Sequence, residues 1–98
     1  MFARIGVWEG SAEDLERWVT RSSKEVKPAV QCQPGVQGAY WLLDRPGRKA
    51  LTITLWESED AMRKSDERAA SIQTGTVTVS GARVITERYE IVDHFRAT

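Results

Sequence analysis

A strand-to-helix junction that occurs twice is the feature that most constrains the fold of this chain. The first copy, Val7–Leu15, and the second, Leu55–Met62, both pass from a β-like stretch through Trp-Glu and a small capping residue into a helix led by Glu-Asp. The copies start half a chain apart in 98 residues, so each half is predicted to form one β-α-β unit. Two such units make a split βαββαβ sheet in a single α+β domain covering residues 1–98.

Hydrophobic periodicity and turn residues give the limits of the predicted elements. Residues 2–8 alternate as a strand, and Ser11 with Asp14 three places on resembles a capping box at the start of a helix. Pro34-Gly35 ends that helical segment, and Pro46-Gly47 joins two strands into a hairpin. The other predicted elements are the hairpin strands at 36–44 and 50–56, a helix at 59–72 and a last strand at 83–92.

Two segments carry signals that conflict with a regular helix. Pro28 has no backbone N–H, so we expect it to disturb the hydrogen bonding of the first helix. The second helix has an apolar stripe followed by Thr76-Val77-Thr78-Val79, which alternates as a strand does. Residues 74–81 are therefore predicted to form either a short strand or an extended loop. The apolar stripe of the predicted second helix, which precedes these residues, consists of Met62, Ser65, Ala69 and Ile72.

Charge and cysteine content exclude several classes of partner. Fourteen basic and fourteen acidic residues give a net charge of +0, which argues against nucleic acid or an anionic membrane as the main partner. The third strand also lacks the alternating basic and aromatic residues of RNA-recognition modules. No secretory signal or membrane-length apolar segment is visible, and the single Cys32 cannot form an internal disulfide. These features predict a cytoplasmic protein.

The strands are apolar at both parities, although right-handed crossovers place both helices on one face of the sheet. Leu51, Ile53 and Leu55 alternate with Thr52 and Thr54, so neither side of the third strand is strongly polar. A monomer would then expose a large apolar patch on the face without helices. A second copy packing sheet against sheet by twofold symmetry would cover it, so we expect a homodimer.

Two motifs resemble those of antibiotic-biosynthesis-monooxygenase-like proteins. Leu51–Met62 is similar to the strand–Trp–small–acid–helix signature of that family, and Pro34–Gly38 resembles its "PG-x-x-G" opening of the second strand. The resemblance covers most of the chain, from Ile5 to Val92, and implies a ferredoxin-like protomer and a dimeric α/β barrel. Members of the superfamily include cofactor-free oxygenases of polycyclic phenols, quinol oxygenases and haem-degrading enzymes. The activity implied by the resemblance is therefore broad.

Departures from the family patterns narrow this range. The haem-degrading members use an Asn on the first strand and a Trp and a His around the second helix, whereas this chain has no asparagine and its predicted second helix has neither Trp nor His. The phenol oxygenases are described with a pocket of Trp, Tyr, Arg and Asn. Only the aromatic and cationic part of that pocket could be present here, so a cofactor-independent reaction on a small aromatic or polycyclic phenol or quinol is one hypothesis. A non-catalytic, homodimeric ligand-binding or accessory protein is the alternative.

Four side chains are candidates for substrate binding. Arg4 shares strand parity with Trp8, so a buried cation beside an aromatic wall could bind a phenolate; an arginine whose head reaches water is the simpler interpretation. Thr54, like Thr52, shares parity with Trp56 and could supply a hydroxyl to the same cavity, although β-propensity explains both threonines equally well. Trp56 could stack against a flat ligand or simply anchor the strand-to-helix corner.

Other reactive residue types offer little support for catalysis. His94 lies after the last strand and is expected to be a solvated tail residue rather than a general base. Cys32 is expected to be partly buried and inert, because the only histidine is far along the chain. No Cys or His pair has metal-ligand spacing, and no glycine-rich phosphate loop is present. We therefore expect no metal and no bound cofactor.

Overall fold

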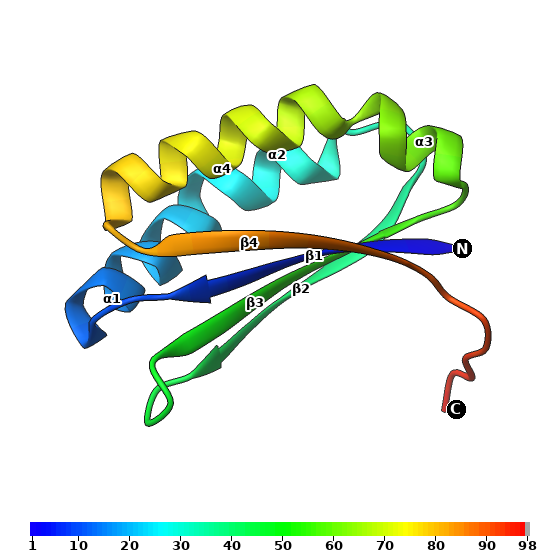
Figure 1. Ribbon diagram of the computed structural model, residues 1–98. Coiled ribbons are helices and arrows are strands. Elements are labelled where there is room, and N and C mark those ends of the chain that lie inside the picture. The colour runs from blue at the N-terminus through cyan, green and yellow to red at the C-terminus, as the bar shows by residue number, and fades with distance from the viewer. Residues whose placement is uncertain (98) are drawn as a thin grey trace.

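A computed structural model describes residues 1–97 and shows one sheet covered by helices. The chain runs through strand β1, a first helical segment, the β2–β3 hairpin, a second helical segment and strand β4 (Figure 1). The elements are β1 (Phe2–Glu9), α1 (Ala12–Arg21), a π-helical segment (Ser22–Val26), α2 (Lys27–Gln31), β2 (Val36–Asp44), β3 (Lys49–Trp56), α3 (Glu59–Lys64), α4 (Asp66–Ser80) and β4 (Arg83–Glu90). The predicted βαββαβ order is confirmed.

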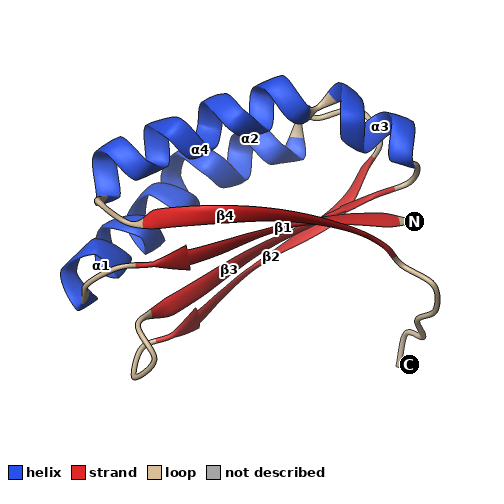
Figure 2. Ribbon diagram, in the orientation of Figure 1, coloured by secondary structure: helices blue, strands red, loops and turns tan. Residues whose placement is uncertain are grey.

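The sheet is four-stranded and antiparallel, with strand order β2-β3-β1-β4. All helices lie on one side of it, and the opposite side carries no helix (Figure 2). The first crossover places β2 one strand position away from β1, and β3 fills that position; the second crossover places β4 on the other side of β1. This is the ferredoxin-like α+β architecture that the repeated junction predicted.

Alternation along the strands separates the two faces of the sheet. Arg4 and Trp8 of β1 are buried beneath the helices, and their register partners Thr54 and Ala50 on β3 are buried with them. Residues of the other parity face away from the helices, as strand geometry requires. Several large apolar residues on that open face are exposed: Tyr40 (59%), Leu42 (44%), Ile85 (70%) and Tyr89 (50%).

The first helix begins with the capping box expected from the sequence. The Ser11 side chain accepts from the Asp14 backbone N–H at 3.1 Å, and the Asp14 carboxylate accepts from the Ser11 N–H at 3.0 Å. Mainly because of that backbone hydrogen bond, the pKa of Asp14 is lowered from its ordinary value. Pro28 cannot donate a helical hydrogen bond, and the turn just before α2 is π-helical. The expected disturbance is therefore confirmed, although the chain stays helical through Pro28.

The strand-or-loop prediction for residues 74–81 is wrong, because α4 continues to Ser80. Thr76 and Ser80 donate to the carbonyls of Ile72 and Thr76, four residues back, so both buried hydroxyls are satisfied within the helix. Ile72, Thr76 and Ser80 also extend the sheet-facing stripe at four-residue spacing, and Thr76 and Ser80 are both buried. Gly81 then ends the helix with a φ of 84°.

The Pro34-Gly35 turn requires its glycine. Gly35 has a φ of 81°, and a Cβ added there would lie 2.6 Å from the Cβ of Ala61 on α3. The Gly35 carbonyl also accepts from the Glu57 N–H at 2.9 Å. The turn thus brings the start of β2 against the start of the second helical segment.

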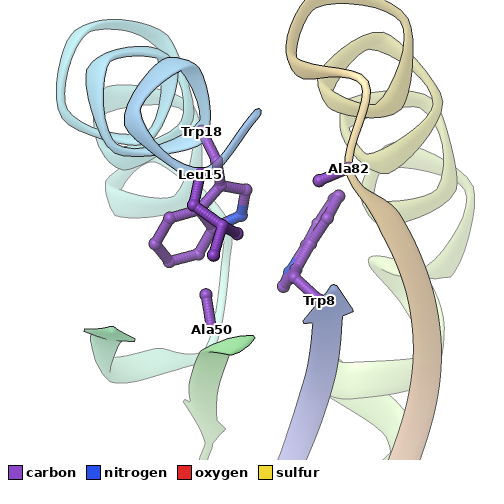
Figure 3. Close-up of a cluster of buried hydrophobic side chains, with 5 residues drawn as sticks. All are labelled: Trp8, Leu15, Trp18, Ala50 and Ala82. Carbon is purple, nitrogen blue, oxygen red and sulfur yellow. The ribbon is translucent and has the colours of Figure 1, made fainter. Parts of the chain in front are cut away.

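The main hydrophobic core lies at one end of the sheet, beneath α1. Leu15 and Trp18 reach from α1 toward Trp8 and Ala50 on the sheet, and Ala82 closes the cluster beside Trp8 (Figure 3). The rings of Trp8 and Trp18 are tilted by 53°, with centroids 6.2 Å apart. This is a favourable aromatic arrangement, and it fixes the first helix on the sheet.

The C-terminal end of the chain leaves the sheet earlier than predicted. β4 stops at Glu90 rather than at Val92, although the Ile91 N–H still donates to the Met1 carbonyl at 2.8 Å. His94 is exposed, as expected for a tail residue. Cys32 is exposed too, so the expectation of partial burial is wrong; it lies at the end of α2, where the chain turns away from the sheet.

Within residues 1–97, the longest apolar stretches of helix are too short or too polar to cross a bilayer.

Candidate functional site

A small cavity lies between the helices and the sheet. Its volume is about 60 Å³, well below the roughly 300–1,000 Å³ typical of pockets for drug-sized ligands. The floor comes from β1, β2 and β3, and the walls come from the first helical segment and from α4. The lining residues that carry the site are Arg4, Trp8, Trp18, Trp41, Thr52, Thr54, Trp56, Arg68, Ile72 and Gln73.

Arg4 occupies one end of the cavity and is buried, with only 5% of its surface exposed. Its Nη2 donates to the Met62 carbonyl at 2.7 Å and to the Ser65 hydroxyl at 3.0 Å, both on the second helical segment. Its guanidinium also lies 5.5 Å from the ring centroid of Trp56, within cation–π distance. The simpler expectation, a head that reaches water, is wrong because α3 and the start of α4 close over β1.

Asp66 supplies the countercharge to Arg4. Its Oδ1 accepts from Arg4 Nη2 at 2.5 Å and from Arg88 Nη2 at 3.3 Å. Burial raises the pKa of Asp66, but the hydrogen bond and charge of Arg4, helped by Arg88, outweigh that effect and hold it below its ordinary value. Burial lowers the pKa of Arg4, and Asp66 opposes that change. The pair is therefore ionised at neutral pH.

The tryptophans of the cavity differ in how their indole N–H groups are satisfied. Trp8 Nε1 donates to the Thr52 hydroxyl at 3.1 Å, and Trp56 Nε1 donates to the Thr54 hydroxyl at 2.9 Å. The Trp41 Nε1 is buried and has no partner among the described residues. The two threonines thus orient two rings through side chains that strand alternation places on the same face.

The two buried side-chain polar atoms that lack a partner among the described residues are both hydrogen-bond donors. Within residues 1–97, the lining includes no Asp, Glu, His, Lys, Tyr or Cys. Arg4 Nε is buried without a partner, in addition to Trp41 Nε1. The Gln73 carbonyl oxygen accepts from Thr86, which leaves its amide N–H groups facing the site. The site can therefore bind an acceptor and exclude water, but it offers no side chain that takes a proton at neutral pH.

All four predicted site residues line this one cavity: Arg4, Trp8, Thr54 and Trp56. Cys32 and His94 do not line it. Two contributions were not predicted. Trp18 of α1 borders the cavity as well as packing in the core, and α4 supplies Arg68, Ile72 and Gln73. The four-residue spacing from Ile72 to Thr76 was the sequence signal that α4 continues along this wall.

Haem does not fit the residues present. A porphyrin is far larger than a cavity of about 60 Å³. No lining residue in the described part of the chain is a His, Cys, Tyr or Met that could bind iron axially. Across residues 1–97, three or more His, Cys, Asp or Glu side chains nowhere gather as a potential metal site. The lining residues therefore do not support haem or metal chemistry at this site.

Comparison with solved structures shows that the chain shares the fold implied by its motifs with proteins that include a putative antibiotic-biosynthesis monooxygenase from Deinococcus radiodurans. The cofactor-independent oxygenase SnoaB of Streptomyces nogalater superposes with a TM-score of 0.67 at 14% identity, over 98% of this chain and 97% of that one. The haem-degrading protein MhuD of Mycobacterium tuberculosis gives 0.73 at 22% identity, over 98% and 100%. A monooxygenase from Streptomyces coelicolor, solved with a bound ligand, also shares the fold.

A further solved structure and the curated relatives complete the comparison. A protein from an uncultured marine organism, described as a dimeric ferredoxin-like protein, has a TM-score of 0.72 at 11% identity, over 98% of both chains. No family model matches the chain. The uncharacterized protein Rv2557 of Mycobacterium tuberculosis is 25% identical over 91 residues, which is 93% of this chain. The chain spans about two fifths (41%) of the length of that relative.

Proposed function

We propose that the protein is a cofactor-independent monooxygenase that acts on a small aromatic phenol or quinol. The single observation that carries the proposal is the cavity itself, in which Trp8, Trp18, Trp41 and Trp56 surround a space closed at one end by the buried Arg4. Flat apolar walls and one cation suit an aromatic ring with an oxygen substituent. The fold shared with SnoaB, an oxygenase described as cofactor-independent, supports this choice.

The reaction uses dioxygen as the only co-substrate. In the keto tautomer of the phenol, the ring methylene acidified by the carbonyl loses a proton to a water molecule. The resulting phenolate, which carries part of its charge on that carbon, gives one electron to dioxygen. The carbon radical and superoxide combine to a peroxide anion, which takes up a proton. Loss of water then leaves a carbonyl, so that CH₂ plus O₂ gives C=O plus H₂O. The protein's part is to orient the ring, exclude bulk water and stabilise the anion with fixed donors.

The size of the cavity favours one or two rings over a polycyclic substrate. A volume of about 60 Å³ leaves little room beyond a single ring unless the walls move apart. Ser22 and Val26 of the π-helical segment form part of the cavity wall. π-helical turns often occur at functional sites.

Oxygen consumption tests this proposal. Single-ring quinols and anthrone-like compounds would be supplied without added cofactor, and oxygen uptake would be measured with an electrode. Ala69→Phe places a ring in the cavity and should abolish uptake, whereas the control Ala70→Phe changes an exposed neighbour that does not line the cavity. Uptake that is equal in both variants, or absent from the unmodified protein with every substrate, would contradict the oxygenase proposal.

A non-catalytic ligand-binding role is the second candidate. It is favoured by the lack of a proton acceptor among the described lining residues, since cofactor-free oxygenation begins with deprotonation. Binding of aromatic compounds, followed by tryptophan fluorescence, separates the two. Saturable binding without oxygen uptake, lost in Ala69→Phe and kept in Ala70→Phe, would identify a binding protein.

We also propose that the functional unit is a homodimer in the cytoplasm. The open face of the sheet exposes Tyr40 and Leu42 on β2 and Ile85 and Tyr89 on β4. Ile53 on β3 and Ile5 on β1 lie between these two edge strands and would connect the apolar surface. A second copy of this chain offers the same surface, so a twofold contact buries both. The dimeric neighbour with the same fold supports this arrangement, and the single cysteine fits a reducing compartment.

A further inference from the structure

We infer that the ligand is bound through an oxygen that accepts hydrogen bonds from Trp41 Nε1 and the Thr52 hydroxyl, and that a phenol is therefore bound as its anion. This inference rests on the proposed function, because it assumes an aromatic ligand in the cavity. It adds the ionisation state of that ligand and names the residues that select it.

Trp41 provides the first observation. Its Nε1 is buried, lacks a protein partner among residues 1–97, and belongs to a side chain that lines the cavity. A buried donor without an acceptor costs free energy, and native proteins rarely retain one without a reason. The other indoles of the strand floor, those of Trp8 and Trp56, each have a threonine acceptor. Trp41 is thus the one strand tryptophan in the described chain whose N–H is left for a ligand.

Thr52 provides the second donor at the same place. It is the register partner of Trp41 on the neighbouring strand, and both side chains line the cavity. Its oxygen already accepts from Trp8 Nε1 at 3.1 Å, and its own proton has no acceptor among the described contacts. Directly opposed side chains on one face lie about 4.5–5.5 Å apart at Cβ, so we place one ligand oxygen between β2 and β3, where it accepts from both residues.

The surrounding charge favours an ionised oxygen. Arg4 contributes a second buried N–H without a partner, at Nε. Arg68 also lines the cavity, and within residues 1–97 it takes part in none of the ion pairs. The lining described above contains no carboxylate or imidazole to accept the proton of a neutral phenol. A phenolate satisfies the donors that are left over, whereas a neutral phenol would also have to place its O–H on a lining hydroxyl or amide oxygen, such as that of Gln33.

A chromophoric phenol tests the inference directly. 4-Nitrophenol ionises near neutral pH, and its anion is yellow, so absorbance reports the ionisation of the bound molecule while tryptophan fluorescence reports binding. We expect bound 4-nitrophenol to ionise at lower pH than the free compound, and to bind at least tenfold more tightly than nitrobenzene, which lacks the phenolic oxygen. A bound phenol that ionises at higher pH than the free compound would overturn the inference.

Matched variants assign the recognition to its residues. Trp41→Phe keeps an aromatic ring and removes the N–H, and Thr52→Val keeps the shape and removes the hydroxyl; each should weaken 4-nitrophenolate binding about tenfold, while nitrobenzene binding changes less than twofold. Thr78→Val is the control, because it removes the hydroxyl of an exposed threonine that does not line the cavity.

The outcomes separate this inference from the proposed function. If neither aromatic compound binds, the aromatic-ligand proposal fails and the inference fails with it. If both compounds bind equally and Trp41→Phe and Thr52→Val behave like Thr78→Val, the cavity binds aromatic rings but the acceptor inference is wrong. Should Trp41→Phe fail to fold, the pH at which the bound phenol ionises in the unmodified protein still decides the matter.

Discussion

Asp66 pairs with two arginines in very different surroundings, which allows the contribution of burial at the site to be measured. The Arg4 side chain is 6% exposed and lies 2.5 Å from Asp66 Oδ1, whereas the Arg88 side chain is 47% exposed and lies 3.3 Å away. Hydrogen bonds to charged groups contribute about 1.5–3 kcal/mol, but Asp66 is itself 39% exposed, so solvent screening reduces this value. We expect a coupling energy of about 1–2 kcal/mol for Arg4–Asp66 and at most about 0.5 kcal/mol for Arg88–Asp66.

Two double-mutant cycles measure these couplings. The first combines Arg4→Met with Asp66→Asn, and the second combines Arg88→Met with Asp66→Asn; urea unfolding at one fixed protein concentration gives each free energy. The cycle subtracts the cost of burying Arg4 by itself, which a single variant would mix into the result. Equal coupling in the two cycles would refute the conclusion that closure of α3 and α4 over Arg4 strengthens the ion pair.

Three further predictions follow from described contacts. Thr76→Val should destabilise the protein by about 1–2 kcal/mol, because it removes the acceptor of the Arg21 Nε–H. The control Thr78→Val, at an exposed position, should change stability by less than about 0.5 kcal/mol. Thermal unfolding measures the stability of both variants. Because the pKa of Asp66 is lowered on folding, its stabilisation is present above the unfolded pKa of about 3.9 and is lost as pH falls through the lower folded value. The Asp66→Asn variant should therefore lose less stability than the unmodified protein during acid titration. Ile85→Lys should shift a dimer toward monomer in sedimentation velocity, and an unchanged sedimentation coefficient would contradict the homodimer proposal.

The order of elements could be predicted because it depends on local patterns. Strand alternation, the Ser11 cap and the Pro46-Gly47 turn each act over a few residues, and the structure places them as expected. Segment 74–81 could not be assigned by the same reasoning, because its β-branched residues favour a strand locally while burial of Thr76 and Ser80 against the sheet favours a helix. Tertiary packing decided that conflict.

The candidate site was predictable only in part, for a related reason. Strand parity placed Arg4, Trp8, Thr54 and Trp56 on one face correctly. Parity could not show that Arg4 would be buried, since that depends on how closely α3 and the start of α4 approach β1. It also could not show which indole N–H would lack a partner, because the hairpin register decides that Trp41 lies opposite Thr52.

Alternation along β3 means that neighbouring codons control different properties of the protein. Thr52 and Thr54 line the cavity, whereas Leu51, Ile53 and Leu55 belong to the opposite face, where we place the partner subunit. A saturation scan of this strand should therefore produce two interleaved phenotypes, altered ligand selection at even positions and altered assembly at odd ones. Selection could change what such a protein recognises, one residue at a time, without changing whether its subunits associate.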